Sequence, residues 1–217
     1  MTWPFAEVAG IAALSLRVAV LATAAACLLG MPFGTWLGTT AFAGRRALLL
    51  LVNAALAVPT VVIGLLVYLV LSRHGPLGAL GLLFTWQAIV IAEVLLAFPI
   101  AAALSAAAVQ AVDPRVRRTA LTLGAGPLRT AWAVASEART SLTAAGIVAF
   151  GRVLSEVGAA LIVGGNIRHQ TRTLTTAVTL ATSQGQFGFA VALGLVLLSV
   201  ALMVNGVIFL LRGRGDA

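Results

Sequence analysis

The chain has little charge, and this shortage excludes most soluble proteins. Only 9% of its 217 residues are charged and 61% are hydrophobic, whereas a typical soluble domain is about 25% charged. So little charge cannot cover a surface that faces water. A disordered chain is excluded as well, because disorder needs low hydrophobicity and high charge. The composition therefore indicates a protein that lies in a membrane.

Lysine is absent, and 14 arginines give the chain a formal net charge of +8. A basic excess can indicate a nucleic-acid partner, but no charged face with interleaved aromatic residues accompanies it here. In a hydrophobic chain, arginine collects in cytoplasmic loops by the positive-inside rule. We therefore expect a lipid bilayer as a partner and no nucleic acid.

Reactive side chains are scarce too. The single cysteine, Cys27, excludes an intramolecular disulfide and a cysteine-cluster metal site. Two Asp, four Glu and two His occur without an H-E-x-x-H, a G-x-S-x-G or a G-x-x-x-x-G-K-[ST] phosphate loop. We expect no enzyme, no metal and no cofactor in this chain, so any ATP hydrolysis would take place on a partner.

Five segments are long and apolar enough to cross a bilayer, which takes about 20 residues. They cover residues 11–37, 47–71, 85–109, 142–163 and 187–211. A break is expected at residues 30–32, and Pro59 and Pro99 are expected to kink the second and third spans. No stretch is polar enough for a soluble domain, so residues 1–217 are predicted to form one all-α polytopic membrane bundle.

The arginines give the orientation. With the N-terminus outside, nine arginines fall on the inner side, four on the outer side and Arg152 within the membrane. The inner set is Arg45, Arg46, Arg115, Arg117, Arg118, Arg129, Arg139, Arg212 and Arg214, and the outer set is Arg17, Arg73, Arg168 and Arg172. The positive-inside rule therefore favours an N-terminus outside and a C-terminus inside.

The inner loop at about residues 112–140 is the most informative segment. Asp113 can cap a helix that starts with Pro114, because proline needs no hydrogen-bond partner at that position. Gly124 and the Gly-Pro pair at 126–127 then end this helix, and a second short helix follows. Arginines mixed with large apolar residues favour docking onto another protein. The alternative is an amphipathic connector at the membrane surface.

This loop resembles the EAA loop of ABC-transporter permeases, whose pattern is E-A-A-x3-G-x9-I-x-L-P. The alanine, glycine and aliphatic positions fall on Ala120, Gly124 and Val134, whereas Arg118 and residues 136–137 depart from the pattern. Residues 149–159 resemble the fourth span of molybdate and tungstate permeases. The segments that resemble the tungstate branch more narrowly are 58–68, 72–78, 137–139, 164–167 and 171–177.

The resemblance covers about residues 10–210 and implies the permease subunit of a type I ABC importer for tungstate in the bacterial cytoplasmic (inner) membrane. It also implies a dimer of two copies, separate ATPase subunits that bind ATP and Mg, and an extracytoplasmic oxyanion-binding protein. Molybdate or vanadate is the alternative substrate. A secondary transporter or channel is the rival class, which would typically carry inverted repeats.

In such a permease, the inner loop would meet the ATPase. The residues expected to couple the two subunits are Arg117, Arg118, Thr119, Ala120, Gly124, Ala125 and Pro127. Gly124 would allow a sharp backbone turn, and Arg117 and Arg118 could pair with acidic residues of an ATPase cleft. The alternative for each arginine is a purely topological role.

Two charges lie within the fourth predicted span. Arg152 and Glu156 are four residues apart, so they can pair on one helix face. Charges within a membrane usually face a bundle interior or a water-filled path. We expect the pair either to line the anion path or to fix helix packing. Glu93, in the third span, has no partner visible in the sequence.

Pro59, Thr60 and Arg172 are further candidates for the path. Thr60 offers a hydroxyl beside the kink at Pro59, where an ordinary packing kink is the alternative. Arg172, with Arg168 and His169, precedes a short amphipathic helix that carries a threonine-rich face. Positive charge and hydroxyl donors there would suit a tetrahedral dianion. A lipid-surface helix anchored by arginine is the alternative.

Overall fold

The computed structural model describes residues 5–213 of the chain, and side chains of residues 6–206. The described residues form helices and no strand, which confirms the prediction of an all-α fold. The helices are α1 (Phe5–Thr39), α2 (Arg45–Ala55), α3 (Thr60–Leu71), α4 (Trp86–Gln110), α5 (Pro114–Thr122), α6 (Pro127–Glu137), α7 (Arg139–Leu154), α8 (Gly158–Gly164), α9 (Leu174–Ser183) and α10 (Phe187–Gly213), with a 3-10 turn at Gly78–Leu80.

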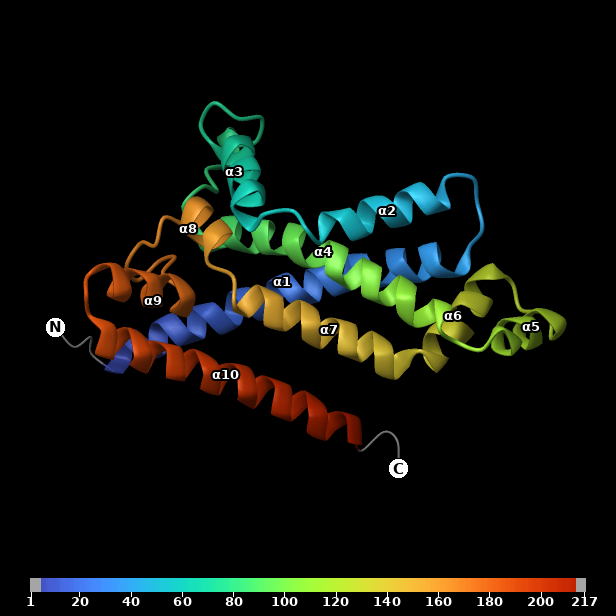
Figure 1. Cartoon of the computed structure of the whole chain (residues 1–217). Coiled ribbons are helices and arrows are strands. Elements are labelled where there is room, and N and C mark those ends of the chain that lie inside the picture. Colours follow the sequence, from blue (N-terminus) through green and yellow to red (C-terminus); the bar gives the residue numbers. More distant parts are fainter. Residues whose placement is uncertain (1–4, 214–217) are drawn as a thin grey trace.

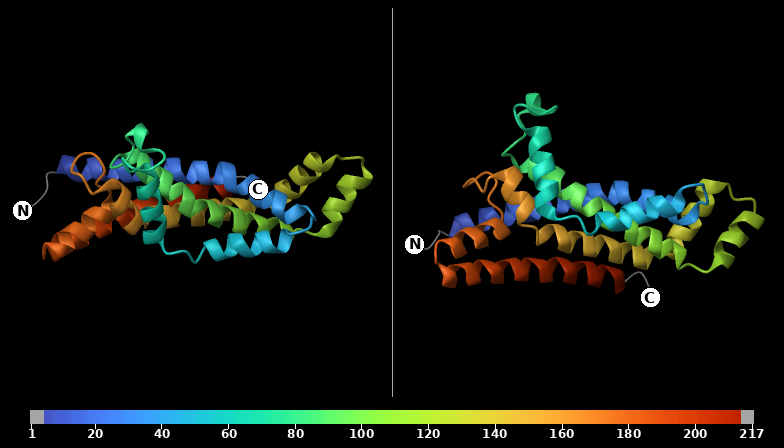
Figure 2. Two further views of the ribbon diagram at one scale, coloured as in Figure 1. Left: turned by 90° about the horizontal axis from the view of Figure 1, so that it is seen from above. Right: turned by 45° about the horizontal axis from the view of Figure 1, so that its top comes forward.

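Four long helices, α1, α4, α7 and α10, run along the length of an elongated bundle (Figures 1 and 2). Helix α2 lies along α4, whereas α3 projects from the bundle at a steep angle while packing on α8 and α4 (Figure 1). Helices α5 and α6 form one end of the molecule, and α9 with the start of α1 forms the other end (Figure 1). The two ends therefore hold the two surface segments that the sequence singles out.

Three continuous helices are long and apolar enough to cross a membrane, namely residues 6–39, 86–110 and 187–206. Two further helix pairs pass the same test together but are sharply bent. The bend between α2 and α3 is 97°, and that between α7 and α8 is 58°. Length and composition therefore allow up to five spans, two of them broken.

The breaks differ in part from the expected ones. Pro59 was predicted to kink the second span, and the chain there breaks fully between α2 and α3. The span expected at residues 142–163 is interrupted, because α7 ends at Leu154 and α8 begins at Gly158, although the two helices together pass the length and composition test. The expected break at residues 30–32 is wrong, because α1 continues through Pro32.

Close packing of α1 on α4 explains why α1 stays whole. Gly30, Gly34 and Gly38 recur every fourth residue and face α4, where a Cβ on Gly34 would overlap the Ala102 carbonyl oxygen. A Cβ on Gly30 would lie 2.9 Å from the Ala101 Cβ. Small residues at this spacing let two membrane helices approach closely and gain van der Waals contact. This contact holds the proline-containing turn of α1 in helical form.

Helix α3 is packed on one face only. A Cβ on Gly64 would lie 2.8 Å from the Ala159 Cα, so α3 and α8 touch backbone to backbone. The opposite side of α3 carries apolar side chains that are 44–54% exposed. These are Val61, Val62, Leu65, Leu66 and Leu69. A broken span thus brings the start of α3 to α8 and leaves an open apolar face.

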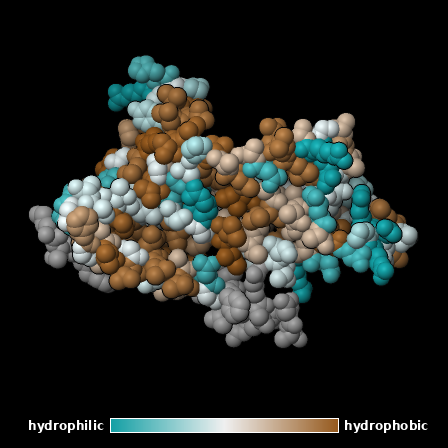
Figure 3. Space-filling model, viewed as in Figure 1, coloured by the Kyte–Doolittle hydropathy of each residue, from teal (hydrophilic) through white to brown (hydrophobic). Residues whose placement is uncertain are grey.

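Polar and apolar surfaces are separated along the bundle. Hydrophilic residues gather over the end formed by α5 and α6, and hydrophobic residues cover much of the middle (Figure 3). At the same end, Arg45 donates from Nε to the Leu37 carbonyl at 2.8 Å, so it caps the last turn of α1. Arg214, counted above with the inner arginines, lies outside the described residues, and the side chain of Arg212 is not described.

We predict opposite effects for the same change at two glycines of α1. Gly34→Ala forces α1 away from α4 and destabilises the protein by about 1–3 kcal/mol, as overpacked cores do. The Cβ added by Gly10→Ala has no neighbouring atom within 4 Å, so this change stabilises the helix by about 1 kcal/mol at most. The measurement is the temperature at which each detergent-purified variant loses its monodisperse elution peak. Equal shifts for both variants would contradict the packing described.

Candidate functional site

The break between α7 and α8 is held by Glu156. Its buried side chain accepts the Ala159 backbone N–H at Oε1 over 3.1 Å and pairs through Oε2 with Arg152 Nη1 at 2.9 Å. Its main-chain carbonyl accepts the Thr175 hydroxyl at 2.7 Å. Backbone groups inside a membrane need such partners, because no water is present there to bind them. Glu156 therefore satisfies the polar groups that the broken helix leaves open.

The predicted Arg152–Glu156 ion pair is confirmed, although the two residues do not share one continuous helix. Arg152 lies in the last turn of α7 and Glu156 lies in the break. The Arg152 side chain is 41% exposed and that of Glu156 is 3% exposed. A guanidinium carries five N–H donors, so Arg152 can pair with Glu156 and still present donors on the open side. This asymmetry suits an anion that arrives from that side.

The break in the second predicted span meets this pair. A Cβ on Gly158 would lie 3.3 Å from the Thr60 hydroxyl and 3.5 Å from Glu156 Oε1. Gly158 thus separates Thr60, which follows Pro59 at the start of α3, from the Glu156 carboxylate. Two segments about 100 residues apart in the sequence come together where both helices are interrupted. The structure brings together Pro59, Thr60, Arg152 and Glu156.

Glu93 lies beside this cluster, which the sequence did not reveal. It is 2% exposed, and among the described residues its Oε2 atom has no hydrogen-bond partner. A cavity of about 20 Å³ is lined by Glu93, Glu156, Ser15 and Thr175, which is room for one water. Because Glu156 already compensates Arg152, an ionised Glu93 would be a buried charge without a counter-ion. Its neighbour Glu156 lies more than 60 residues away in the sequence, so no local pattern could have shown this contact.

A second charged cluster lies at the opposite end from α5 and α6. Arg168 forms a two-pronged pair with Glu7, with Nε–Oε1 at 2.7 Å and Nη2–Oε2 at 2.6 Å. This hydrogen bonding raises the pKa of Arg168 above its usual value. Arg172 Nη1 lies 3.9 Å from Glu7 Oε1, and its Nε donates to Asn166 Oδ1 at 3.2 Å. The cluster ties the start of α1 to the loop that precedes α9.

Arg172 is the more enclosed of the two arginines. Its side chain is 13% exposed, against 58% for Arg168, and burial lowers its pKa from the usual value while Glu7 opposes that effect. The structure therefore places Arg172 against Glu7 and Asn166. A path role for Arg172 would need these contacts to rearrange.

The predicted short helix after Arg172 is present as α9. Thr173 caps it, and Thr176 completes a capping box by accepting the Thr173 N–H at 2.9 Å. Thr171 donates to the Gly164 carbonyl and accepts the Ile167 N–H. These buried hydroxyls therefore bind backbone groups of the protein, and Thr179, further along α9, is exposed.

The inner loop folds as predicted. Asp113 caps α5 by accepting the Arg115 N–H at 2.8 Å, and Pro114 is the first helical residue. Gly124 has a φ of +80°, in the left-handed region that favours glycine, and Pro127 starts α6. The chain therefore makes a helix, a glycine turn and a second helix.

The coupling candidates lie at the surface of this end. Arg117, Arg118, Thr119, Gly124 and Pro127 are exposed, and Ala120 and Ala125 are partly exposed. The large apolar side chains beside them are open as well: Leu121 is 51% exposed, Leu123 82%, Leu128 84% and Trp132 75%. Val134, 3% exposed, anchors α6 against Val109 and Ala138. The buried side of α6 thus holds this end of the molecule in place, and its exposed side presents arginines together with large apolar side chains.

We predict that two isosteric changes in the buried cluster differ in effect. Glu156→Gln removes the counter-ion of Arg152 and lowers stability by about 1–3 kcal/mol. Glu93→Gln changes stability by less than about 0.5 kcal/mol, because no cation pairs with Glu93 among the described residues. Thermal unfolding of the two purified variants and wild type is the measurement. A loss for Glu93→Gln as large as that for Glu156→Gln would contradict the charge assignment.

Comparisons with known proteins give the family of the chain. Residues 30–214 match the family described as "Binding-protein-dependent transport system inner membrane component". The chain is 38% identical to the tungstate uptake system permease protein TupB of Peptoclostridium acidaminophilum, over 92% of this chain and 87% of that protein. It is 40% identical to a probable anion ABC transporter permease protein of Haloferax volcanii, over 90% and 86% of the two chains.

A molybdenum permease and a solved structure extend the comparison. The chain is 32% identical to the molybdenum transport system permease protein ModB of Escherichia coli (strain K12), over 87% of this chain and 86% of that protein. A crystal structure of an amino acid ABC transporter shares the fold, with a TM-score of 0.68 at 17% identity over 99% of this chain and 100% of that one. The chain therefore belongs to the family of inner membrane components of binding-protein-dependent transport systems, the permease subunits of ABC transporters.

Proposed function

We propose that this permease imports a tetrahedral oxyanion and that its substrate is tungstate. The observation that carries the proposal is the 38% identity to a tungstate uptake permease over nine-tenths of the chain, against 32% to a molybdenum permease. The site is compatible with an anion, since Arg152 is open on one side and Thr60 lies close by. Molybdate or vanadate is the second candidate, because these oxyanions have almost the same shape and charge as tungstate and a pore would hardly distinguish them.

In this proposal, the anion path passes Pro59, Thr60, Arg152 and Glu156, and Arg172 lies nearer its outer end. Arg152 attracts the oxyanion with its open donors. Glu156 holds part of the positive charge, so the anion is bound weakly enough to leave, as conduction requires. Thr60 adds a hydroxyl at the point where the two broken helices meet.

The proposed topology is that of a type I importer, with a single membrane domain of five spans. The N-terminus lies outside and the C-terminus inside. Support comes from the arginines at the start of α2 and along α5 and α6, which share one end of the bundle. The positive-inside rule assigns that end to the cytoplasm.

The proposed partners follow from surfaces that the single chain leaves open. A second copy would cover the exposed apolar side of α3, where Val62 and Leu65 are 44% and 50% exposed. Separate ATPase subunits would bind ATP and Mg, because this chain carries no phosphate loop. An extracytoplasmic oxyanion-binding protein would deliver the anion at the end formed by α9 and the start of α1.

Coupling to the ATPase is proposed to occur through α5 and the turn after it. Arg117 and Arg118 would pair with acidic residues in a cleft of the ATPase. Thr119, Ala120, Ala125 and Pro127 would form the contact surface around Gly124. The support is the exposure of this surface on an anchored base. Exposed Leu123 and Leu128 would be covered when the ATPase binds.

We predict that Gly124→Val uncouples transport while the protein still inserts. At a φ of +80°, a β-branched residue costs about 1–2 kcal/mol, which lowers the equilibrium constant for forming the native turn about tenfold. Anion uptake should fall by a similar factor, while membrane-inserted protein stays at the wild-type level. Gly124→Asn is the control, because asparagine tolerates this backbone region. Wild-type uptake with Gly124→Val would rule out this coupling role.

The substrate is tested by deleting the gene and measuring cellular tungsten, molybdenum and vanadium over low external concentrations. We expect tungsten to fall and molybdenum to stay near wild type, with recovery on complementation. A fall confined to molybdenum or vanadium would overturn the choice of tungstate. Movement of the anion down its gradient through the purified chain alone, without ATPase, would favour a secondary transporter or channel.

A further inference from the structure

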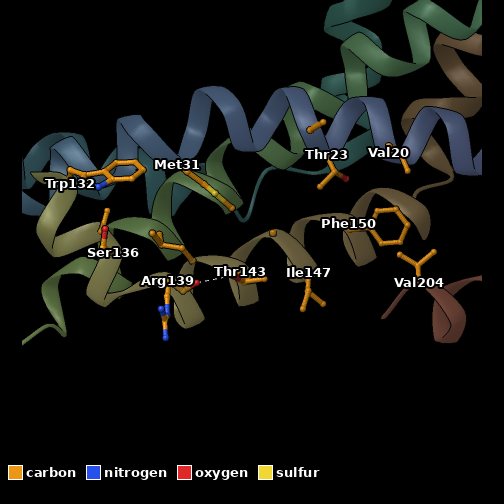
Figure 4. A pocket seen from close by; sticks show the side chains of 14 residues that line it. Val20, Thr23, Met31, Trp132, Ser136, Arg139, Thr143, Ile147, Phe150 and Val204 are labelled. Atoms are coloured by element: carbon orange, nitrogen blue, oxygen red, sulfur yellow. Dashed lines mark hydrogen bonds between the residues drawn. The ribbon is translucent and has the colours of Figure 1, made fainter. Parts of the chain in front are cut away.

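An apolar groove runs along the side of the bundle away from α3. It has a volume of about 860 Å³ and is lined by side chains of α1, α6, α7 and α10. Val20 of α1 and Phe150 of α7 lie near one end, beside Val204 of α10 (Figure 4), and Ala24 and Ile147 line the groove as well. The volume lies within the range of about 300–1,000 Å³ that small-molecule sites occupy. None of the path or coupling residues lines this groove.

The length of the groove matches one leaflet of a bilayer. Its lining along α7 extends from Arg139 to Phe150, which at about 1.5 Å per residue is roughly 16 Å. Half of the hydrocarbon core of a bilayer is about 15 Å thick. A whole helix of this length, about 10 Å across, would need roughly 1,250 Å³, more than the groove offers. An extended acyl chain fits these dimensions better than a helix does.

One end of the groove is polar and the rest is mainly apolar, with Thr23 and Thr143 as its polar side chains. Trp132, Ser136 and Arg139 line the end beside α6, and all three are exposed. The Arg139 side chain extends away from the apolar side chains (Figure 4), while its carbonyl accepts the Thr143 hydroxyl at 2.8 Å. Tryptophan and arginine are the residues typical of the level of lipid headgroups. This end therefore suits an anionic headgroup.

We propose that this groove is a specific site for an anionic phospholipid. One acyl chain lies between α1, α7 and α10, and the phosphate lies against Arg139 and Trp132. The lipid belongs to the leaflet on the side of α5 and α6, which is the inner leaflet in the orientation proposed above. Helix α10 packs directly on α1 and α7 beside the groove, and its Val204 lines it, so the acyl chain would extend this contact. The site does not depend on which oxyanion is imported.

The test measures phospholipid that stays bound after extensive detergent washing, by native mass spectrometry of the purified protein. Ala24→Trp fills the groove from an exposed position of α1 and should lower retained lipid at least tenfold. Leu29→Trp is the matched control, since Leu29 is 57% exposed on the same helix and does not line the groove. It should retain lipid like wild type.

The headgroup is tested separately by adding back phosphatidylglycerol or phosphatidylcholine with the same acyl chains. Arg139→Gln should lower the preference for phosphatidylglycerol about fivefold, since one arginine near an anionic surface is worth about 1 kcal/mol. It should lower the binding of phosphatidylcholine less, because the choline cation offsets the charge of that phosphate. An equal loss for both lipids, or no loss for either, would overturn the anionic headgroup.

Two outcomes would overturn the groove as a lipid site. One is full lipid retention by Ala24→Trp together with Ile147→Trp, which fills the groove from α7. The other is loss of the second copy rather than of lipid in these variants, which would make the groove a contact between subunits. Monodisperse elution of each variant shows that it is folded, so neither outcome can arise from misfolding.

Discussion

The fold depends on how backbone polar groups find partners where the membrane-spanning helices are interrupted. At the break between α7 and α8, the Glu156 side chain accepts one backbone N–H and pairs with Arg152, while its carbonyl accepts the Thr175 hydroxyl. No water would be available in the bilayer to replace these bonds. The same residue thus stabilises the break and sets the charge of the site.

Irregular backbone at membrane depth is tolerated where it is buried in protein or lines a cavity. Here both interrupted spans meet at Gly158, which lies between Thr60 and Glu156. The contact of Gly64 with Ala159 continues the same seam between α3 and α8. The two interruptions thus bring a hydroxyl, an arginine and a compensating carboxylate to one region, which is where we propose the anion path.

Local sequence patterns predicted the features that depend on neighbours in the chain. These include the apolar segments, the Asp113 cap and the Arg152–Glu156 pair, because each rests on spacing within a few residues. Contacts between distant segments stayed hidden, such as Glu93 beside Glu156. The continuity of α1 through Pro32 was missed as well, although the four-residue glycine spacing at Gly30 and Gly34 was a readable signal of close helix packing.

Helix α4 connects the buried cluster around Glu93 to the start of α5. It runs unbroken for 25 residues, and α5 begins at Pro114, only a few residues after its end at Gln110. Glu93 lies 17 residues from that end, about 25 Å along the axis. A tilt of about 5° at the α5 end would therefore move Glu93 by roughly 2 Å. A shift of that size would change the distance between the carboxyl groups of Glu93 and Glu156, which line one small cavity.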